Sequence, residues 1–545
     1  MTSNAWAQIL LLAAVCFFSF FIHLGAHDVD LMEARNFVTA REMALEGHWL
    51  IPTMNGELRI AKPPLPTWLT AVAGIAAGSF DEDAVLRLPA ALMAAVMVLM
   101  LWGLMRALFP DPLLPLISAL VLATSLLVLD MGRRGSWDIY CHSFMLAAIW
   151  ALAVGLKKEK KAYGVFVLAG ILLAFSFMSK GPVAFYALLL PFGVAYLAAY
   201  GVRVVVTKWK GILLSLGICL VLSGLWPLLI YAVHPDGVAR VVHQETTAWG
   251  NRHSQPFYFY AGFAMYAGFW APAVIAGLMA PFARKRVNGF ANYRFVLVWL
   301  VLTLILLTII PEKKERYLLP AAIPMAVAAA CIWRNVFESI AANRLSSGDR
   351  RLLDVHTILA AAAALGMPVL IFYYGRNAVP SVSVSGAAGW TVLFAALTVI
   401  LFIAWKKRRG IAIFISIVLL TVLINLSALP VFYQSPLYKK HADTHVLRNI
   451  RSMDVLKGIP VYSVEKLDIK EIWDAGRTIR PWNPISRPPP IQHGPIALIS
   501  TVDPARGLLF AYRKAIDTKV VGKFTTATGR RDRKTVYYLT LISAK

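Results

Sequence analysis

The stretch from His27 to Trp68 has the sequence HDVDLMEARNFVTAREMALEGHWLIPTMNGELRIAKPPLPTW and is the longest polar passage in the first four-fifths of the chain. It follows one apolar segment, Ala5 to Leu24, and precedes a long series of others. Charged side chains crowd into it, and prolines break it into short pieces. A plain connection between two membrane helices needs only a few residues. A loop of this length and charge at a membrane surface therefore indicates binding or chemistry.

The composition of the chain places it in a membrane. Apolar residues make up 59% of the 545 residues and charged residues only 15%, unlike a soluble enzyme of this length. The formal net charge of +25 fits cytoplasmic anchoring and contact with anionic lipid, so no nucleic-acid partner is expected. The cysteines show no metal-ligand spacing and are expected in the apolar core: Cys16, Cys141, Cys219 and Cys331.

Apolar runs of about 18 residues or more recur along the chain, each able to cross the ~30 Å hydrocarbon layer as a helix. We therefore expect an all-α polytopic membrane protein with about thirteen spans. They lie at roughly 5–24, 84–108, 112–130, 139–156, 162–178, 182–200, 210–233, 257–282, 294–311, 317–336, 354–374, 388–405 and 411–430. The first lacks a basic segment before it and a small-residue cleavage site, so it is expected to be retained. The apolar piece Pro66–Ser79 is too short to cross and is expected in the interface.

The basic connectors orient this series of spans. They are 157–161, 203–210, 284–294, 334–351 and 406–409. With thirteen spans they all fall on one side, which the positive-inside rule makes cytoplasmic. The first outer loop (25–83), the Arg133–Asp138 turn, the His234–Pro256 loop and the tail after Pro430 then face outward.

The chain changes character after Pro430, where the apolar runs shorten. Four segments have the pattern of β-strands: Ile459–Val464, Pro495–Thr501, Lys519–Thr525 and Thr535–Ile542. Trp482 to Pro490 is a proline-rich loop. We expect a transmembrane domain over residues 1–430 and a small non-cytoplasmic α/β domain over residues 431–545.

A series of short motifs keeps the order and spacing of one enzyme family. They are Glu33-Ala34-Arg35, Ala40-Arg41-Glu42-Met43, Gly47-His48-Trp49, Asn55-Gly56, Lys62-Pro63-Pro64, Asp138, Ser179-Lys180-Gly181, Glu245, His253 and Tyr317-Leu318-Leu319-Pro320. Together they resemble the GT-C class of bacterial membrane glycosyltransferases, among them the lipid A aminoarabinose transferases and the related protein O-mannosyltransferases. The resemblance covers about residues 20–325. It implies a GT-C fold in the bacterial inner membrane, with helical outer loops over a cavity and the active site on the periplasmic side.

The resemblance also implies a reaction, in which a hexose or pentose moves from a polyprenyl-phosphate carrier to a lipid, glycan or protein acceptor with inversion. The leaving phosphate gains charge in the transition state, and fixed cations in a water-poor site stabilise that charge. Lys62 matches the phosphate-binding lysine of the family. Further candidate cations are Arg59, Lys313, Lys314 and Arg316. The ordinary alternative for each is a solvated side chain or a lipid contact.

A carboxylate is needed to orient or deprotonate the attacking hydroxyl, or to hold a metal ion that does so. The family usually has an acidic pair before its arginine, but here Met32 precedes Glu33, so the first acid is missing. Asp28 or Asp30 could replace it, or Glu33 could act alone. Asp138, which begins a span, is the fourth catalytic candidate. Helix capping is the alternative for all four acids.

The remaining candidates are assigned to substrate binding, and they are Arg35, Lys180, Glu245, His253 and Tyr317. A divalent metal ion is left open. Ala61 stands where the family commonly has an acid, and Thr246 stands where a histidine can occur. His243, Glu245 and His253 could rebuild a metal site.

Two other kinds of protein are considered. A transporter or flippase for a polyprenyl-linked or anionic lipid also uses intramembrane acids and broken helices. Transporters tend to show repeated halves, however, and the polar residues here gather at one face. A basic membrane scaffold would not need Asp138 or Glu33 at their depths. The glycosyltransferase is therefore the preferred prediction.

Overall fold

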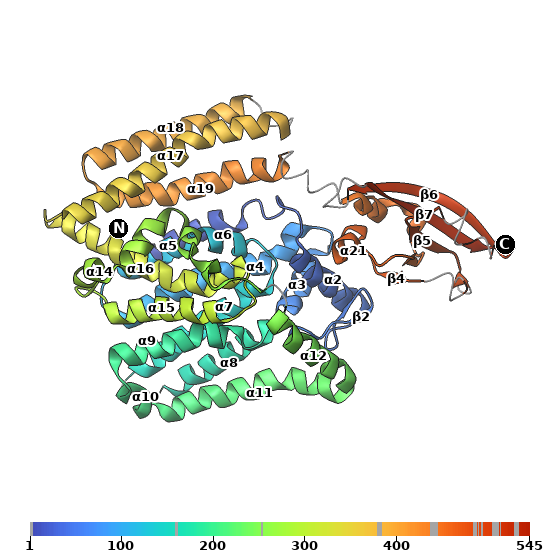
Figure 1. Ribbon diagram of the computed structural model, residues 1–545, viewed down its shortest axis with the longest axis horizontal. Helices are drawn as coiled ribbons and strands as arrows, with labels where there is room; N and C mark the ends of the chain where they lie inside the picture. The colour runs from blue at the N-terminus through green and yellow to red at the C-terminus, as the bar shows by residue number, and fades with distance from the viewer. Residues whose placement is uncertain are drawn as a thin grey trace.

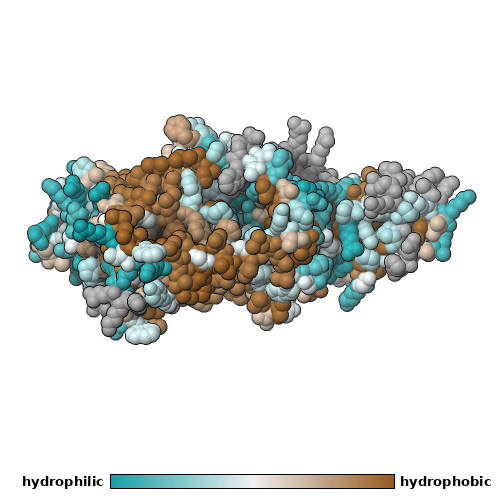
Figure 2. All heavy atoms as spheres, turned by 90° about the horizontal axis from the view of Figure 1, so that it is seen from below, coloured by the Kyte–Doolittle hydropathy of each residue, from teal (hydrophilic) through white to brown (hydrophobic). Residues whose placement is uncertain are grey.

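The structure is a computed structural model. It describes residues 4–158, 162–251, 254–378, 384–435, 445–482, 488, 490–491, 494–503, 509, 512, 514–527 and 534–545. Helices make up one body, and a β-sheet near the C-terminus extends from one end of it (Figure 1). Apolar side chains cover much of the helical body, whereas hydrophilic ones gather at its far end and over the C-terminal sheet (Figure 2). This is the distribution expected of a protein that crosses a bilayer.

Within the described residues, nine helical segments are long and apolar enough to cross a membrane. They are α4 (Asp83–Leu108), α7 (Trp137–Lys157), α8 (Tyr163–Lys180), α11 (Trp209–Val233), Phe257–Leu278, Glu315–Ala341, α17 (Ser347–Ala378), α18 (Val384–Lys406) and α19 (Gly410–Gln434). A tenth is the bent pair α5 (Leu114–Ala123) and α6 (Leu126–Gly132). Shorter apolar helices are Ala5–Phe21, which contains α1 (Ala5–Cys16), α3 (Leu65–Ala77), Phe185–Tyr200, which contains α9 (Leu190–Tyr200), and α15 (Tyr293–Ile309).

Each of the predicted spans coincides with one of these apolar segments. Three of the segments are shorter than a full span, namely Ala5–Phe21, Phe185–Tyr200 and Tyr293–Ile309. The total of thirteen crossings therefore stays a prediction. The helix α3 is the short apolar piece that was expected in the interface. All four cysteines are buried and free, as predicted.

The predicted span at 112–130 is not one straight helix. Its two halves meet at an angle of 63° around Thr124 and Ser125. Both hydroxyls donate to carbonyls one turn earlier, on Leu120 and Val121, and such bonds bend helices. Trp270 Nε1 donates to Thr124 Oγ1 at 2.9 Å. These hydrogen bonds of the two hydroxyl groups explain the bend. A hydropathy pattern does not reveal them.

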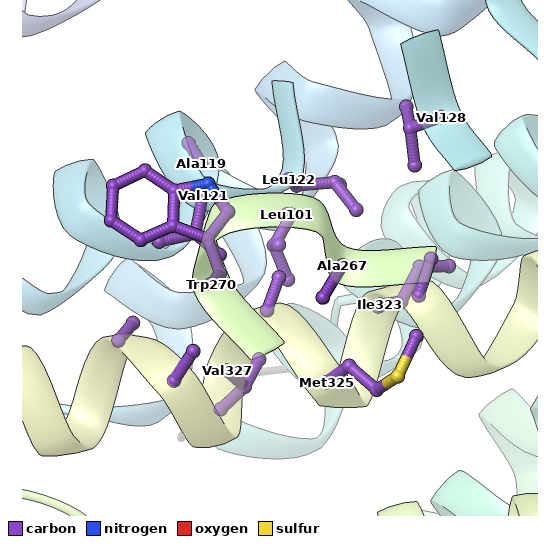
Figure 3. Close-up of a cluster of buried hydrophobic side chains, with 14 of the residues drawn as sticks. Leu101, Ala119, Val121, Leu122, Val128, Ala267, Trp270, Ile323, Met325 and Val327 are labelled. Carbon is purple, nitrogen blue, oxygen red and sulfur yellow. The ribbon is translucent and has the colours of Figure 1, made fainter. Parts of the chain in front are cut away.

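The apolar core of the helical body surrounds α16 (Leu319–Ala341), most of whose residues are buried. Figure 3 shows Ile323, Met325 and Val327 of this helix close to Trp270 and to side chains of α4, α5 and α6. The helices α11 and α18 bury far fewer residues and carry exposed apolar side chains. Exposed apolar faces of this kind suit contact with lipid.

The first outer loop has its own secondary structure. The helix α2 (Leu31–Glu46) begins at a capping box made by Asp30 and Glu33 and ends at Gly47, whose φ is 79°. The strands β1 (Thr53–Met54) and β2 (Glu57–Leu58) then form a hairpin. Asn55 and Gly56, at its tip, have φ values of 57° and 75°, which the Asn-Gly pair adopts readily.

The C-terminal sheet has the order β4-β3-β5-β7-β6. Its strands are β3 (Val461–Ser463), β4 (Ile479–Pro481), β5 (Ile496–Ser500), β6 (Ile516–Ala527) and β7 (Lys534–Ala544). The strand β3 is parallel to β4 and β5, and β7 is antiparallel to β5 and β6. The four predicted strands are confirmed, whereas β4 and the helix α21 (Ile469–Ala475) were not predicted. Most of the proline-rich loop lies outside the described residues, and the domain boundary after residue 430 stays a prediction.

The C-terminal sheet region and the first outer loop share one hydrophobic core. Phe37 and Val38 of α2 are buried with Leu447, Ile450 and Trp473. The rings of Phe37 and Trp473 lie 5.2 Å apart between centroids. The C-terminal region is therefore held on the loop that carries Lys62.

Candidate active site

Asp138 lies in the first turn of α7 and is only 3% exposed. Lys180, the last residue of α8, donates a hydrogen bond to its Oδ1. Arg316 Nε lies 3.8 Å from its Oδ2. A buried carboxylate is costly unless it is paired, and here two cations from different helices pair with it. Three residues that the sequence analysis selected separately thus meet at one point.

The ring of Tyr317 lies among three cations. Lys180 Nζ is 4.7 Å from the ring centroid, Arg316 Cζ is 5.4 Å away and Lys314 Nζ is 5.6 Å away. The tyrosine hydroxyl donates to Glu312 Oε1 at 3.3 Å, and Lys314 Nζ donates to the same oxygen at 2.9 Å. Cations are attracted to the face of an aromatic ring, so Tyr317 helps to hold this group together.

Lys62 reaches the same region from the first outer loop. Its Nζ lies 3.6 Å from Glu245 Oε2, and the two side chains are 33% and 37% exposed. Burial lowers the pKa of Lys62 below its usual value of 10.5, with Glu245 opposing the change and the positive charges of Lys180 and Arg59 adding to it. Lys62 is therefore within electrostatic range of Lys180, which pairs with Asp138.

Arg59 is a second, partly buried cation that the first outer loop brings to the site. Its guanidinium carbon lies 5.7 Å from the centroid of the Trp137 ring. Burial, followed by the charge of Arg35, lowers the pKa of Arg59 to about 10. Among the described residues its Nε has no hydrogen-bond partner, so it is a donor suited to an anionic ligand. The small pocket beside it is lined by Thr39, Met43, Pro52, Arg59, Lys62, Pro64, Thr67 and Trp137.

A buried polar network fixes the loop against the turn that precedes Asp138. Asn36 Nδ2 donates to Thr70 Oγ1 and to the Gly135 carbonyl, both at 3.0 Å, and Thr67 Oγ1 donates to Asn36 Oδ1 at 2.8 Å. A Cβ atom on Gly135 would lie 2.5 Å from the Phe37 ring, so this approach requires glycine. A fully satisfied buried network specifies one arrangement of its elements.

Glu33 occupies a structural position. Its carboxylate is fully buried and accepts hydrogen bonds from Arg87, from the Gly135 amide at 2.9 Å and from the Asp30 amide at 3.1 Å. Burial alone would raise its pKa, but the charge of Arg87 and these bonds lower the pKa of Glu33 below its usual value. Because both oxygens are engaged, we infer that Glu33 holds the loop in place and does not contact substrate. The structure thus shows the alternative role considered for Glu33, in which it caps the first helix of the loop.

Of the two aspartates of the loop, Asp30 has a structural role in capping, and a catalytic role of Asp28 stays a prediction. Asp30 caps α2 through its Oδ1, and its Oδ2 lies 3.0 Å from Arg134 Nη1. Asp28 is partly buried in the segment before α2. Asp138 instead pairs with Lys180 and Arg316, two cations of the candidate site, so we infer that it is the stronger candidate among the four acids.

Lys313 is not part of the cation group around Tyr317. It is 4% exposed, and its Nζ donates to the Gln255 carbonyl at 3.1 Å. Arg35 is partly buried in α2 and acts electrostatically on Arg59. His253 lies outside the described residues. Arg87 was not among the predicted site residues, although a charged residue within the apolar span 84–108 is a signal of a structural or functional role.

The described part of the predicted metal set does not fit a metal ion. His243 and Glu245 are two residues apart on α12 (Pro235–Asn251), so their side chains leave the helix in nearly opposite directions. Ligand atoms of Glu42, Glu46 and His48 do lie within 4.8 Å of one another. The Glu42 carboxylate, however, already accepts from the Asn55 amide at 2.6 Å, among other bonds. No step is therefore assigned to a metal.

The fold matches crystal structures of ArnT from Cupriavidus metallidurans. The TM-score is 0.65 for the form bound to undecaprenyl phosphate and 0.68 for the apo form, with 16% identity and 98% of both chains covered. This likeness confirms the GT-C fold that the sequence predicted, in a multi-pass membrane protein. The class that the sequence predicted for this fold is that of the membrane glycosyltransferases.

Sequence comparisons agree with this class. The model for dolichyl-phosphate-mannose-protein mannosyltransferases matches residues 61–231, and the model for the Alg9-like mannosyltransferase family matches residues 238–380. An undecaprenyl phosphate-alpha-4-amino-4-deoxy-L-arabinose arabinosyl transferase of Pseudomonas fluorescens is 26% identical over 69% of this chain and 67% of its own length. That of Pectobacterium atrosepticum is 25% identical over 67% of this chain and 66% of its own length. The predicted resemblance and enzyme class are confirmed, and the chain spans about two thirds of these relatives.

Proposed function

We propose that this protein transfers a sugar from a polyprenyl-phosphate carrier to an acceptor at the outer face of a bacterial inner membrane, with inversion. The observation that carries the proposal is the pairing of Lys180 and Arg316 with the buried carboxylate of Asp138. Lys62 interacts electrostatically with both Lys180 and Arg59 and so joins the loop cations to this pair. The names of the similar transferases specify undecaprenyl phosphate as the carrier of their sugar. A site of this charge suits a phosphate-linked donor.

The cations serve the leaving group. As the bond between the anomeric carbon and the phosphate oxygen breaks, negative charge grows on the phosphate. Lys62 and Arg59 are held by a proline-rich loop, because Pro63 and Pro64 restrict the backbone next to Lys62. Donors fixed in advance cost no reorganisation in the transition state, and one such donor contributes a factor of about 10²–10³ in rate.

Asp138 serves the acceptor. The acceptor hydroxyl attacks the anomeric carbon on the side opposite the phosphate, and its proton passes to the Asp138 carboxylate. Lys180 and Arg316 orient that carboxylate from two sides. Tyr317, which faces Lys180, is placed to bind substrate beside it. The active site belongs to the periplasmic side, since the basic connectors mark the other side as cytoplasmic.

We further propose a lipid A-like acceptor, on the strength of the aminoarabinose transferases among the relatives. The test uses purified protein, an undecaprenyl-phosphate-linked sugar and lipid A, with mass spectrometry of the products. Envelope lipids and glycoproteins from cells with and without the protein identify the natural acceptor. Release of no sugar from any polyprenyl-phosphate donor would refute the transferase, and movement of intact lipid-linked sugar across vesicles would favour the flippase.

A further inference from the structure

A second pocket lies at the opposite end of the helical body from Asp138. It is formed where α4 and α9 end, beside α14 (Ala280–Val287) and the start of α15, and has a volume of about 880 Å³. Binding sites for small molecules range over roughly 300–1,000 Å³. The 26 residues of α4 separate it from the first outer loop by ~39 Å, and Figure 1 shows α14 far from α2. The pocket is therefore distinct from the candidate active site.

The lining of this pocket is apolar on the inside and cationic at the rim. Leu108, Tyr200, Tyr293 and Leu297 supply apolar and aromatic surface, whereas Arg284 and Arg294 are exposed and line it as well. Among its described lining residues there is no carboxylate. An arginine pair with no acid in the lining favours an anionic ligand.

Two other charged residues next to the pocket, Asp111 and Lys157, have partners within the protein. Asp111, which follows the lining residue Pro110, pairs with Arg334 at 2.8 Å and caps α5 by accepting from the Leu114 amide. Lys157 Nζ donates to the Leu108 carbonyl at 2.9 Å, which adds a third cation beside the rim. The neighbourhood therefore increases the positive charge of the pocket.

The position of the pocket in the membrane indicates which anionic ligand it binds. The pocket includes part of the basic connector 284–294, which the positive-inside rule assigns to the cytoplasmic side. Anionic phospholipids are concentrated in that leaflet and attract basic residues at its surface. We propose that this pocket binds an anionic phospholipid of the cytoplasmic leaflet, with its phosphate facing Arg284 and Arg294 and its acyl chains along the apolar wall.

The test measures binding of phosphatidylglycerol and of neutral phosphatidylcholine to the purified full-length protein by native mass spectrometry. The variant Arg284→Gln/Arg294→Gln should bind phosphatidylglycerol about 25-fold more weakly, because each basic residue near anionic lipid contributes about a factor of five. Binding of phosphatidylcholine should be unchanged. The matched control is Arg344→Gln/Arg351→Gln, which removes the same charge from exposed positions outside the lining.

A second variant keeps both arginines and fills the space. Ala280 lines the pocket, so Ala280→Phe should also weaken phosphatidylglycerol binding, and it decides the question if the double variant does not fold. Thermal unfolding in detergent checks the fold of each variant. An equal loss in the Arg344/Arg351 control, or undiminished phosphatidylglycerol binding when the pocket is altered, would overturn the proposal.

Discussion

Glu33 and Arg87 form a fully buried ion pair that joins the first outer loop to the membrane helix α4. Arg87 Nε donates to Oε1 at 2.7 Å and Nη2 donates to Oε2 at 3.0 Å. The remaining guanidinium nitrogen, Nη1, donates to the carbonyls of Leu24 and His27. One arginine thus fixes the beginning of the loop and the carboxylate that holds Gly135, three residues before Asp138.

Glu33→Gln should therefore lower the free energy of unfolding strongly. The protein that remains folded should keep most of its turnover. Breaking a buried ion pair by changing one partner typically costs about 3–5 kcal/mol. The thermal unfolding midpoint of the purified protein should fall clearly, with reduced yield. Glu82→Gln, at an exposed position just before α4, is the control and should behave as wild type. An unchanged midpoint with a hundredfold loss of turnover would instead return Glu33 to the chemistry.

Asp138→Asn should abolish most turnover, because a general base contributes a factor of about 10²–10⁴. The loss should appear in a single-turnover assay with bound donor, which separates the chemical step from product release. The control is Asp236→Asn, which removes an exposed acid in the first turn of α12. Near-normal single-turnover rates in Asp138→Asn would leave Asp28 or Asp30 to be tested as the acid.

Lys62 should produce an alkaline limit in kcat/KM for the donor. The ammonium form binds phosphate and exists below the pKa, and burial lowers that pKa below 10.5, so activity should fall before free lysine would lose its proton. Lys62→Arg should move this limit to higher pH, because a guanidinium stays protonated, while lowering the rate at neutral pH. Lys62→Ala should lose about 10²–10³ in rate. An identical alkaline limit in wild type and Lys62→Arg would show that another group titrates.

Asn55 should stabilise the attachment of the C-terminal sheet to the first outer loop. Its Nδ2 donates to the Ile479 carbonyl at 2.7 Å, and the Ile479 amide donates to its Oδ1 at 2.8 Å. Asn55→Gly removes these bonds, each contributing about 0.5–1.5 kcal/mol, but tolerates the φ of 57°. Asn55→Ala adds a backbone cost of about 1–2 kcal/mol.

Limited proteolysis should therefore release the C-terminal region fastest from Asn55→Ala, then from Asn55→Gly, then from wild type. The control is Asn449→Ala, at an exposed position of the C-terminal region. Equal release rates for all of these proteins would show that the shared hydrophobic core alone sets the attachment.

The orientation can be tested with single cysteines in a background lacking the four buried native ones. Lys457, whose side chain is 81% exposed, lies in the region predicted to be outside. Lys457→Cys should react with a membrane-impermeant thiol reagent in intact spheroplasts. Arg344→Cys, in a basic connector, should react only after permeabilisation. The reverse pattern would place the candidate active site on the cytoplasmic side.

The sequence by itself determined the local features of this protein. Hydropathy located every apolar helix, because a membrane span needs a continuous apolar run wherever it packs. The Asn55-Gly56 pair and the capping residues Asp30 and Glu33 define turns and helix ends through contacts within a few residues. Four strands of the C-terminal sheet follow from short apolar runs between turns. The family resemblance and the chemistry that it implies selected Asp138, Lys180 and Arg316, without showing that they meet.

Only the tertiary structure decided what the charged residues do. Glu33 is engaged by an arginine 54 positions away, and Asp138 is paired with a lysine 42 positions away. Such pairings depend on how helices lie against one another, which no local pattern encodes. A carboxylate with every oxygen hydrogen-bonded inside the protein holds structure, whereas one paired with the cations of the candidate site is the better candidate for chemistry. For this reason the sequence proposed four acids, and the packing of α2, α4, α7 and α8 leads us to propose Asp138 among them.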